Sequence, residues 1–502
     1  MRRFNAFRHV FFIACLLLSN VILSASVIES VNGETGDRSW ENANIWVGEV
    51  VPGAADTVII NGLVTVYTPV PETFTACAKL TVNSGGILRD YWAGVLHVNG
   101  DMINNGTVEN SYDGTYHLFL KVSGNITNNG VWKNAVTTLN GSEVQHLSGS
   151  GEFSGNEFVS ENSADTLVAD TDLLFYTTTI DLNNDRLELQ GNQLSLTGTG
   201  YSGGTCYLSE SELIGGNGEI YANSYGVLAN SVINDVTLTG IVQVANGCEF
   251  KGTVTVGDTL NNTWGDGATL DVKGNLVNNG VIRDANSFYL LTLNIDGNLT
   301  NNGEWTNYTT NLSGKNDQHL MFSSIFSGTY LNDTDSSSSI FADSDISFFT
   351  TFVELDSSIL CLQGYKLSLT GTGYSGETCY LSEAELIGGN GEIYANSYGV
   401  LVNSVINDVT LTGIVQVANG CEFKGTVTVG DTLNNTWSDG ALLDVKGNLV
   451  NNGVIRDANS FYLLTLNIDG NLTNNGEWTN TITNLSGSNV QHLAISSPFS
   501  GH

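Results

Sequence analysis

The chain has 502 residues, including 57 glycines and 4 prolines, and a formal net charge of −34. Such an acidic surface repels phosphate backbones, so nucleic acid is excluded as an expected partner. No proline occurs between residues 72 and 497, and because proline cannot donate to a β ladder, this composition favours continuous paired strands over a series of globular domains.

The first 26 residues have the pattern of a secretory signal. Arg2, Arg3 and Arg8 precede an apolar run over 10–25, which ends in small residues suited to cleavage. Cys15 lies early in this run, which continues for ten residues beyond it, so a lipoprotein anchor is not favoured. No second apolar segment of spanning length follows. We therefore expect a secreted or cell-surface chain with no transmembrane segment in its mature part.

Internal repetition is the strongest signal in the sequence. Residues 194–307 recur at 367–480, a shift of 173, with five differences. A diverged upstream copy shares the register, because the Gln-His-Leu at 145–147 returns at 318–320. We therefore predict a signal peptide at 1–26, an N-terminal cap with the first coils at 27–70, and three repeat units. These units span 71–159 (diverged), 160–332, and 333–502 (truncated).

A shorter period lies inside each unit. Residues 270–280 and 293–303 share alternating apolar residues, then glycine, then Asn-Asn-Gly, at a shift of 23. Glycine and asparagine, which tolerate positive φ, follow the strand residues there. A short strand with one apolar face cannot bury that face alone, but stacked coils of about 23 residues bury it continuously. Because 173 is not a multiple of 23, some coils must be longer or shorter.

The sequence thus predicts an all-β fold, a right-handed parallel β-helix (β-solenoid), elongated, with an N-terminal cap. The competing fold is a sandwich or barrel made of hairpins, since Asn-Gly often marks hairpin turns. The short motif keeps the same order in successive modules, which favours the solenoid. We interpret the Asn-Asn-Gly series as amide ladders between neighbouring coils, a structural role.

Six cysteines remain after the signal. Cys206 and Cys248 are 42 residues apart, as are Cys379 and Cys421, so a bridge within each pair depends on a Cα separation below about 7 Å. The simpler interpretation is that these residues, together with Cys77 and Cys361, are small buried hydrophobes. Their disulfide state stays open at this point.

The opening of the chain resembles secreted bacterial β-helix proteins, including G8-like domains. The resemblance rests on Trp40 and Trp46, the segments 58–62 and 64–66, and the Leu-Asn-Gly to Gln-His-Leu stretch over 139–147. Such proteins are often repetitive, adhesin-like surface proteins of Bacteroidota that are secreted by the type IX system. The resemblance implies architecture and location but not activity. Because the chain stops inside the third unit, we expect a truncated reading frame, a missing C-terminal continuation or a capping partner.

Few residues suggest chemistry. His146, His319 and His492 recur once per unit, and we interpret them as stacking positions rather than catalytic bases. Three aspartate pairs have members two residues apart, but none has a calcium-loop pattern, so we predict no metal site beyond weak surface Ca²⁺ and no cofactor. These pairs are Asp170/Asp172, Asp333/Asp335 and Asp343/Asp345.

The function expected is a non-enzymatic structural or adhesion protein, a stalk or binding surface whose partner is an extracellular glycan or cell-surface polymer. Lys251, Lys273 and Arg283 recur at a shift of 173, and a single active site is rarely duplicated with its scaffold. The alternative is a carbohydrate-binding or polysaccharide-degrading β-helix. Eight tyrosines are the candidates for a sugar-stacking strip, although core or turn packing is the simpler interpretation. They are Tyr201, Tyr207, Tyr221 and Tyr225, with their copies Tyr374, Tyr380, Tyr394 and Tyr398.

Overall fold

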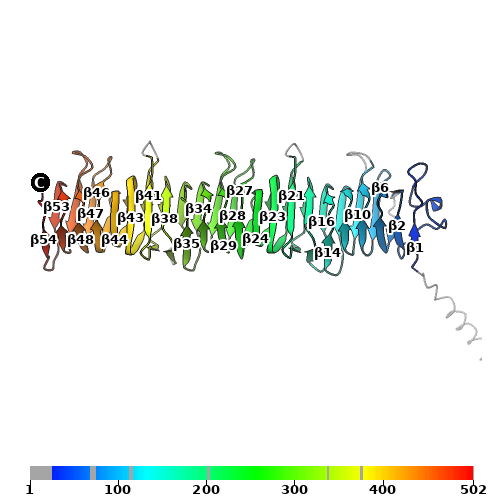
Figure 1. Cartoon of the computed structure of the whole chain (residues 1–502), viewed down its shortest axis with the longest axis horizontal. Helices are drawn as coiled ribbons and strands as arrows, with labels where there is room; N and C mark the ends of the chain where they lie inside the picture. The colour runs from blue at the N-terminus through cyan, green and yellow to red at the C-terminus, as the bar shows by residue number, and fades with distance from the viewer. Residues whose placement is uncertain are drawn as a thin grey trace, which may run out of the picture. The chain divides into compact units, whose positions relative to one another are not determined.

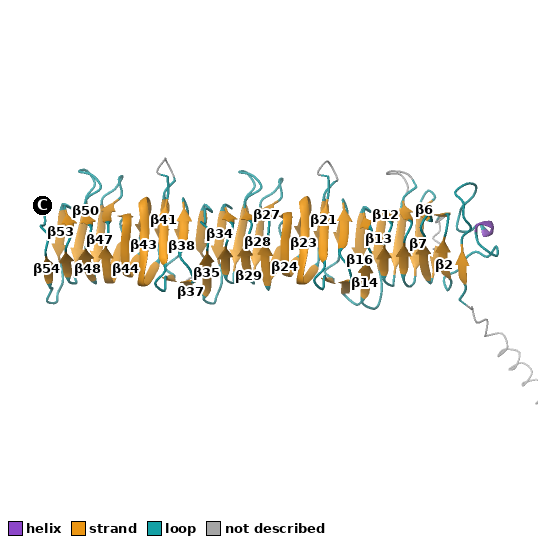
Figure 2. Cartoon of the chain, in the orientation of Figure 1, coloured by secondary structure: helices purple, strands orange, loops and turns teal. Residues whose placement is uncertain are grey.

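The computed structural model describes residues 25–67, 75–111, 117–199, 204–335, 338–372 and 377–500. The chain divides into two compact units, one ending at Asp165 and one beginning at Thr166. Both are almost wholly strand (Figures 1 and 2), and each is a parallel β-solenoid, with about 20 coils in the chain as a whole. The fold predicted from the sequence is therefore confirmed as a parallel solenoid. The signal pattern at 1–24 lies outside the described residues, and the boundaries of the repeat units stay predictions.

The first unit contains one short 3₁₀ helix, η1 (Ala43–Ile45), and sixteen described strands. The strands are β1 (Val27–Glu29), β2 (Thr57–Ile60), β3 (Leu63–Val66), β4 (Thr75–Cys77), β5 (Lys79–Val82), β6 (Ile87–Asp90), β7 (Gly94–Val98), β8 (Met102–Asn104), β9 (Thr107–Glu109), β10 (Leu118–Val122), β11 (Ile126–Asn128), β12 (Val131–Lys133), β13 (Val136–Leu139), β14 (Gln145–Ser148), β15 (Glu152–Phe153) and β16 (Glu157–Ser160).

From β2 onward, each strand of the first unit pairs in parallel with the third strand after it, as in the ladder β2–β5–β8–β11. One coil therefore consists of three strands, and three ladders run along the unit. A hairpin fold would need antiparallel ladders, and among the described strands every ladder is parallel. The hairpin alternative is wrong here, because apolar residues stack on the next coil rather than on a returning strand.

The second unit continues the same plan with longer strands at its repeats. Its strands are β17 (Thr166–Ala169), β18 (Leu173–Tyr176), β19 (Thr179–Asp181), β20 (Arg186–Glu188), β21 (Gln193–Thr197), β22 (Cys206–Ser209), β23 (Glu212–Ala229), β24 (Val232–Val244), β25 (Cys248–Lys251), β26 (Thr253–Val256), β27 (Thr259–Asn262), β28 (Ala268–Val272), β29 (Asn275–Asn278), β30 (Val281–Ile282), β31 (Leu291–Ile295), β32 (Leu299–Asn301), β33 (Glu304–Trp305), β34 (Thr309–Leu312), β35 (Gln318–Phe322), β36 (Tyr330–Asp333), β37 (Ser339–Ala342), β38 (Ile346–Phe349), β39 (Phe352–Glu354), β40 (Ile359–Cys361), β41 (Lys366–Thr370), β42 (Cys379–Ser382), β43 (Glu385–Val402), β44 (Val405–Val417), β45 (Cys421–Val429), β46 (Thr432–Asn435), β47 (Ala441–Val445), β48 (Asn448–Asn451), β49 (Val454–Ile455), β50 (Leu464–Ile468), β51 (Leu472–Asn474), β52 (Glu477–Trp478), β53 (Ile482–Leu485) and β54 (Leu493–Ile495).

The core consists of inward-facing side chains that alternate along each strand and rest on their counterparts in the next coil. Leu270 pairs with Leu293, and both are fully buried. This register confirms the 23-residue period, and Asn104 pairs with Asn128 at the 24-residue spacing of the upstream copy. Each apolar side chain of the core is thus covered by the coil before it and the coil after it, which a single strand cannot achieve.

Coil length is not uniform. Partners on neighbouring coils are 16 residues apart at Gly226 and Val242, and 28 apart at Val353 and Leu381. Corner loops take up part of the difference, and the rest lies inside β23, whose register against β24 shifts between Ile214 and Gly218 and between Asn223 and Gly226. The prediction that some coils are longer or shorter is therefore confirmed.

Successive repeats do not return to the same ladder. Leu213 and Leu401 lie on the same ladder, which runs through Phe250, Leu312 and the strands β36, β39 and β42. In the repeat, however, Leu401 is the counterpart of Leu228 and not of Leu213. The counterpart of Leu213 is Leu386, which lies on a different ladder with Leu360. Each copy thus advances by whole coils plus one strand.

The Asn-Asn-Gly segments bond neighbouring coils to each other. The Asn278 Nδ2 group donates to Asn301 Oδ1 (2.8 Å) and to the Glu304 carbonyl (2.9 Å), while the Gly280 amide donates to Asn278 Oδ1 (3.1 Å). Asn278 is fully buried. The amide ladder predicted from the sequence is present.

None of the described asparagines or glycines in these segments has a positive φ, although both residue types tolerate it. Glycine is required for another reason. A Cβ atom on Gly303 would collide with the carbonyl oxygen of Gly280 in the coil below. The close stacking of coils, rather than a left-handed backbone, explains the glycine.

Residues 30–56 fold over the first coil as a cap. Trp40 and Trp46 are buried edge to face with ring centroids 5.1 Å apart, and the Trp46 indole donates to the Trp40 carbonyl (2.8 Å). Arg38 is also buried, and its guanidinium donates to the carbonyls of Leu63 (2.7 Å) and Val31 (2.8 Å). The cap predicted for this region is present in the described residues up to 67.

We expect Asn278→Ala to lower the free energy of unfolding by about 1–3 kcal/mol, because it leaves buried partners of the amide without hydrogen bonds. The matched control is Asn279→Ala, which removes an exposed amide next in sequence and should change stability by less than about 0.5 kcal/mol. Urea unfolding, with hydrogen exchange at β29 and β32, measures both. Equal effects of the two variants would contradict a buried amide ladder.

Candidate binding surface

Two loops on neighbouring coils of the second unit carry its most exposed aromatic side chains. We call them the paired loops: residues 263–267, between β27 and β28, and residues 283–290, between β30 and β31. They display Trp264, Phe288 and Tyr289. The repeat places a second set at 436–440 and 456–463, with Trp437, Phe461 and Tyr462.

One buried amide joins the two loops. The Asn262 Nδ2 group donates to the carbonyls of Asp266 (2.9 Å) and Tyr289 (3.0 Å), and Asn262 Oδ1 accepts from the Ala285 amide (2.8 Å). In the second set, Asn435 makes the same bonds within 0.1 Å. The loops are thus fixed to each other by a side chain with no exposed surface.

Asp284 and Asn286 fix the longer loop internally. The Leu291 amide donates to Asp284 Oδ1 (2.6 Å), and the amides of Phe288 and Tyr289 both donate to Asn286 Oδ1 (2.9 and 3.0 Å). Burial raises the pKa of the Asp284 carboxyl, and hydrogen bonds from backbone amides oppose that rise. Asn286 Nδ2 also reaches the Trp264 carbonyl in the other loop (3.2 Å).

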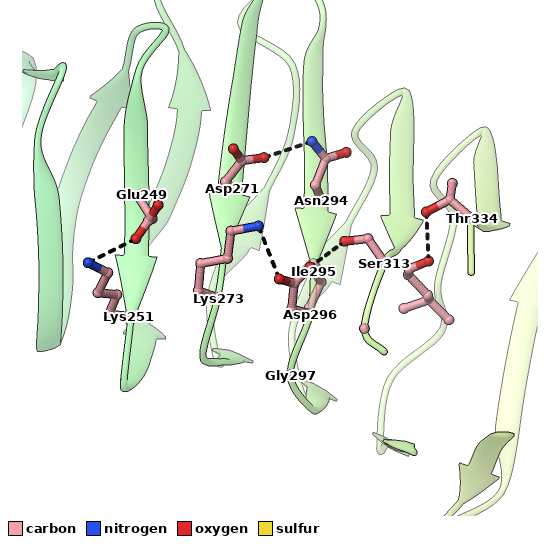
Figure 3. A network of polar contacts seen from close by, with 12 residues as sticks. Glu249, Lys251, Asp271, Lys273, Asn294, Ile295, Asp296, Gly297, Ser313 and Thr334 are labelled. Atoms are coloured by element: carbon pink, nitrogen blue, oxygen red, sulfur yellow. Dashed lines mark hydrogen bonds and ion pairs between the residues drawn. The ribbon is translucent and has the colours of Figure 1, made fainter. Parts of the chain in front are cut away.

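A polar ladder runs along the strands that the paired loops lead into, and Figure 3 shows its first pair, Asp271 and Asn294. Asp271 Oδ1 accepts from Asn294 Nδ2 (2.8 Å), Asn294 Oδ1 from Asn311 (2.8 Å), and Asn311 Oδ1 from Asn332 (3.1 Å). The ladder begins again in the next copy, where Asn467 donates to Asp444 (2.9 Å). It offers a row of amide and carboxylate groups at the strand spacing.

The basic residues singled out in the sequence lie in or near this ladder. Lys273 Nζ is 3.0 Å from Asp296, and Lys251 Nζ is 3.1 Å from Glu249. The same pairs recur at Lys446 and Lys424. These ion pairs are exposed and add little to stability. Arg283 lies apart from them, at the start of the longer loop.

The first unit has a related but shorter aromatic loop. Tyr91 and Trp92 are more than half exposed, and Tyr91 packs edge to face on Tyr67 at 6.3 Å. Asp90, fully buried, accepts from the Ser111 amide (2.7 Å) and hydroxyl (2.9 Å). Tyr67, Asp90, Tyr91 and Ser111 line an open groove of about 920 Å³ that reaches the cap.

The three repeated histidines are not brought together. Each backbone amide donates to an asparagine of the coil below, as His319 does to Asn298 (3.0 Å). The His319 ring packs on Phe341 and bonds Asp343 (3.0 Å). They occupy stacking positions, as the sequence predicted.

The neighbouring glutamine has the larger structural role. Gln318 Nε2 donates to the carbonyls of Ile295 and Gly297 (both 2.8 Å), and its Oε1 accepts from Gly314 (3.3 Å). Gln145 makes the equivalent bonds in the first unit. Sequence reasoning missed this residue, although its recurrence before each histidine was visible.

The aspartate pairs serve the turns between strands. Asp172 Oδ1 accepts from the Gln193 amide and Asp345 Oδ1 from the Lys366 amide, both at 2.9 Å. No group of three or more histidine, cysteine or acidic residues arranged to hold a metal ion occurs in the described parts of the chain. The weak surface calcium allowed by the sequence stays a prediction.

The six cysteines in the described part of the chain are thiols rather than disulfides. Cys206 lies beside Gly226 and Cys248 beside Leu270, on different ladders. Burial raises the pKa of Cys248 and Cys421 to about 11 and that of Cys77 and Cys379 to about 12. Five of the six are buried, which confirms the interpretation as small core residues for them, whereas Cys361 is half-buried and alternates with the inward-facing Leu360 on β40.

The tyrosines do not form the continuous strip that was considered. Tyr207 and Tyr221 lie on different ladders, and Tyr201 and Tyr374 lie outside the described residues. Tyr380 instead joins a row that the sequence did not reveal. The row consists of Tyr308, Tyr330, Phe352 and Tyr380, with centroids 5.0 to 5.4 Å apart on successive coils.

No known protein family matches the chain, and no curated protein or solved structure shows a significant match to it. The resemblance to G8-like and type IX-secreted proteins gains no support from this, while the parallel β-helix architecture stands on the structure itself. Across the described residues, no helix is long and apolar enough to cross a membrane.

Asp333 tests how burial changes the pKa of a carboxyl group at the end of a strand that lines the core. Its side chain is 4 % exposed, one carboxylate oxygen has no hydrogen-bond partner, and burial raises its pKa. A carboxyl group whose pKa is higher in the folded than in the unfolded chain lowers the free energy of unfolding when it is ionised. This loss of stability is absent below the unfolded pKa and complete above the folded pKa. Ser160 occupies the same repeat position in the first unit, so a neutral side chain fits there.

We therefore expect Asp333→Asn to be more stable than the parent at pH 7 and equally stable below about pH 3, where the aspartate is also protonated in the unfolded chain. Urea unfolding across this pH range measures the difference. The control is Asp343→Asn, which should not show this gain, because Asp343 bonds His319. A gain that is constant with pH would contradict the ionisation argument.

Proposed function

We propose that the chain is a non-enzymatic structural and adhesion protein, secreted or held at a cell surface, whose solenoid displays a repeated binding surface. The observation that carries the proposal is the duplication of the paired loops and the polar ladder with the same hydrogen bonds in both copies. Display at several points along a scaffold gains from copies of a surface, because linked sites bind more tightly than one site. Catalysis gains little from duplicating its scaffold.

The state of the carboxylates agrees with this proposal. In the polar ladder Asp271 accepts from Asn294, while beside it Asp296 is paired with Lys273. A glycoside hydrolase needs one carboxylic acid and one carboxylate facing a common bond. Asp284 accepts from the backbone amide of Leu291, the first residue of β31, which suits a structural role.

Location and partner are part of the proposal. The basic and apolar pattern of residues 1–26 is typical of a signal for export. A strongly acidic exterior keeps a long secreted solenoid soluble and discourages contact between copies. The proposed partner is an extracellular glycan or cell-surface polymer.

A glycan array with labelled protein, run beside turnover assays on the same polysaccharides, tests the proposal. We expect retention on a subset of glycans, with no new reducing ends and no unsaturated uronic products above a mock purification from the same host. Turnover that exceeds the mock purification would show an enzyme and overturn the proposal. Absence of retention on every glycan would also count against it.

A further inference from the structure

We propose that each set of paired loops is a binding site for a neutral polysaccharide, and that the two sites of the second unit bind one polymer chain together. This inference rests on the proposed function and names the ligand class of its repeated surface. It begins from exposure. Trp264 is 66 % and Phe288 87 % exposed, and their counterparts Trp437 and Phe461 are 63 % and 87 % exposed. Folding gains little from side chains left in water.

The loops that carry these rings are nevertheless tightly specified. Asn262 is fully buried and bonds three backbone groups across both loops besides the Thr263 carbonyl (3.1 Å). Asn286 adds a bond from one loop to the other. A rigid support under exposed rings is what a binding site needs, because the rings lose little freedom when a ligand arrives.

The groups around the rings indicate the kind of ligand. Asp266, Arg283 and Ser287 are exposed in the same loops, so donors and acceptors border the aromatic faces. A sugar ring has an apolar C–H face that packs on an aromatic ring and hydroxyl groups that bond to such neighbours. An apolar protein partner or a lipid would leave these polar groups without bonds.

Charge selects among sugars. With a formal net charge of −34, the chain repels anionic polysaccharides, anionic membranes and other copies of itself. Each set of paired loops has one cationic side chain and two carboxylates. The loops therefore have no local excess of positive charge that would offset the repulsion of an anionic polysaccharide by the whole chain. A neutral polysaccharide carries no such penalty.

The spacing of the two sites favours a polymer. Eight successive pairings connect β28, which follows one short aromatic loop, with β46, which precedes the other. At ~4.8 Å per pairing, about 40 Å of ladder separates β28 from β46. In the view of Figure 1, the loops after β27 and after β46 both lie along the upper edge of the second unit. One extended chain can therefore reach both sites, and binding at the first raises the effective concentration at the second.

Native affinity electrophoresis in gels that contain hydroxyethyl cellulose, galactomannan, α-mannan or soluble starch tests this, with alginate as the anionic control. The variants are Trp264→Ala/Phe288→Ala, Trp437→Ala/Phe461→Ala and the combination of all four. The matched control is Tyr225→Ala/Tyr398→Ala, which removes a repeated pair of exposed aromatics outside the paired loops. Circular dichroism verifies that each variant is folded.

We expect retardation of the parent by at least one neutral polymer. Each double variant should weaken that binding at least ten-fold and the fourfold variant at least a hundred-fold, while the control binds like the parent. Calorimetry with a hexasaccharide of that polymer should give two sites in the parent and one in each double variant, with unchanged affinity per site.

Parent-like binding by the fourfold variant would overturn the inference, as would binding to alginate alone or to no polymer. If the fourfold variant still binds the glycans retained by the parent on the array, the inference fails while the proposed adhesion function stands. Cleavage of a polymer by the parent instead removes the proposed function, whatever the loop variants do.

Discussion

The close stacking of one coil on the next is the constraint on which the rest of the structure depends. Backbone hydrogen bonds fix the spacing, so each side chain must fit directly against the residue that occupies its position in the next coil. Leu270 on Leu293 and Asn278 on Asn301 satisfy this in two ways, by apolar contact and by a buried amide bond. Where even a Cβ atom is too large, as at Gly303, only glycine remains.

The same constraint leaves the corners between strands open to variation. Coil length changes from 16 to 28 residues between paired positions while the ladders stay parallel, and corner loops together with register shifts inside β23 take up the difference. The paired loops occur at such corners, where buried asparagine and aspartate side chains, rather than an apolar core, hold them. The stacked coils thus fix where the corner loops lie, and the corner loops form the surface that we propose for binding.

Much of the fold could be predicted from the sequence because stacking repeats the same residue type at a fixed interval. The 23-residue period gave the pairing of Asn278 with Asn301, and the absence of proline indicated continuous ladders. The step of each repeat onto a different ladder could not be predicted, because it depends on the number of strands in coils of unequal length.

The candidate site was less predictable than the fold. Histidine and tyrosine drew attention as chemically distinctive residues, whereas Gln318 and Asn262 form the bonds between segments. Asn262 bonds a carbonyl 27 residues away, and such a contact follows from the register of the coils rather than from any local pattern. Exposure of Trp264 and Phe288 likewise depends on which way a corner loop leaves the ladder.

Cross-linking across neighbouring coils tests the stacked parallel arrangement most directly. Asp271 and Asn294 are register partners on adjacent strands with side chains on the outer face. We predict that Asp271→Cys with Asn294→Cys forms a disulfide under mild oxidation, detected by mass spectrometry of the bridged peptides, since paired strands place Cα atoms within about 4.4–6.8 Å. Asp271→Cys with Thr292→Cys, two residues out of register, should not. A bridge in the second pair and none in the first would contradict the account.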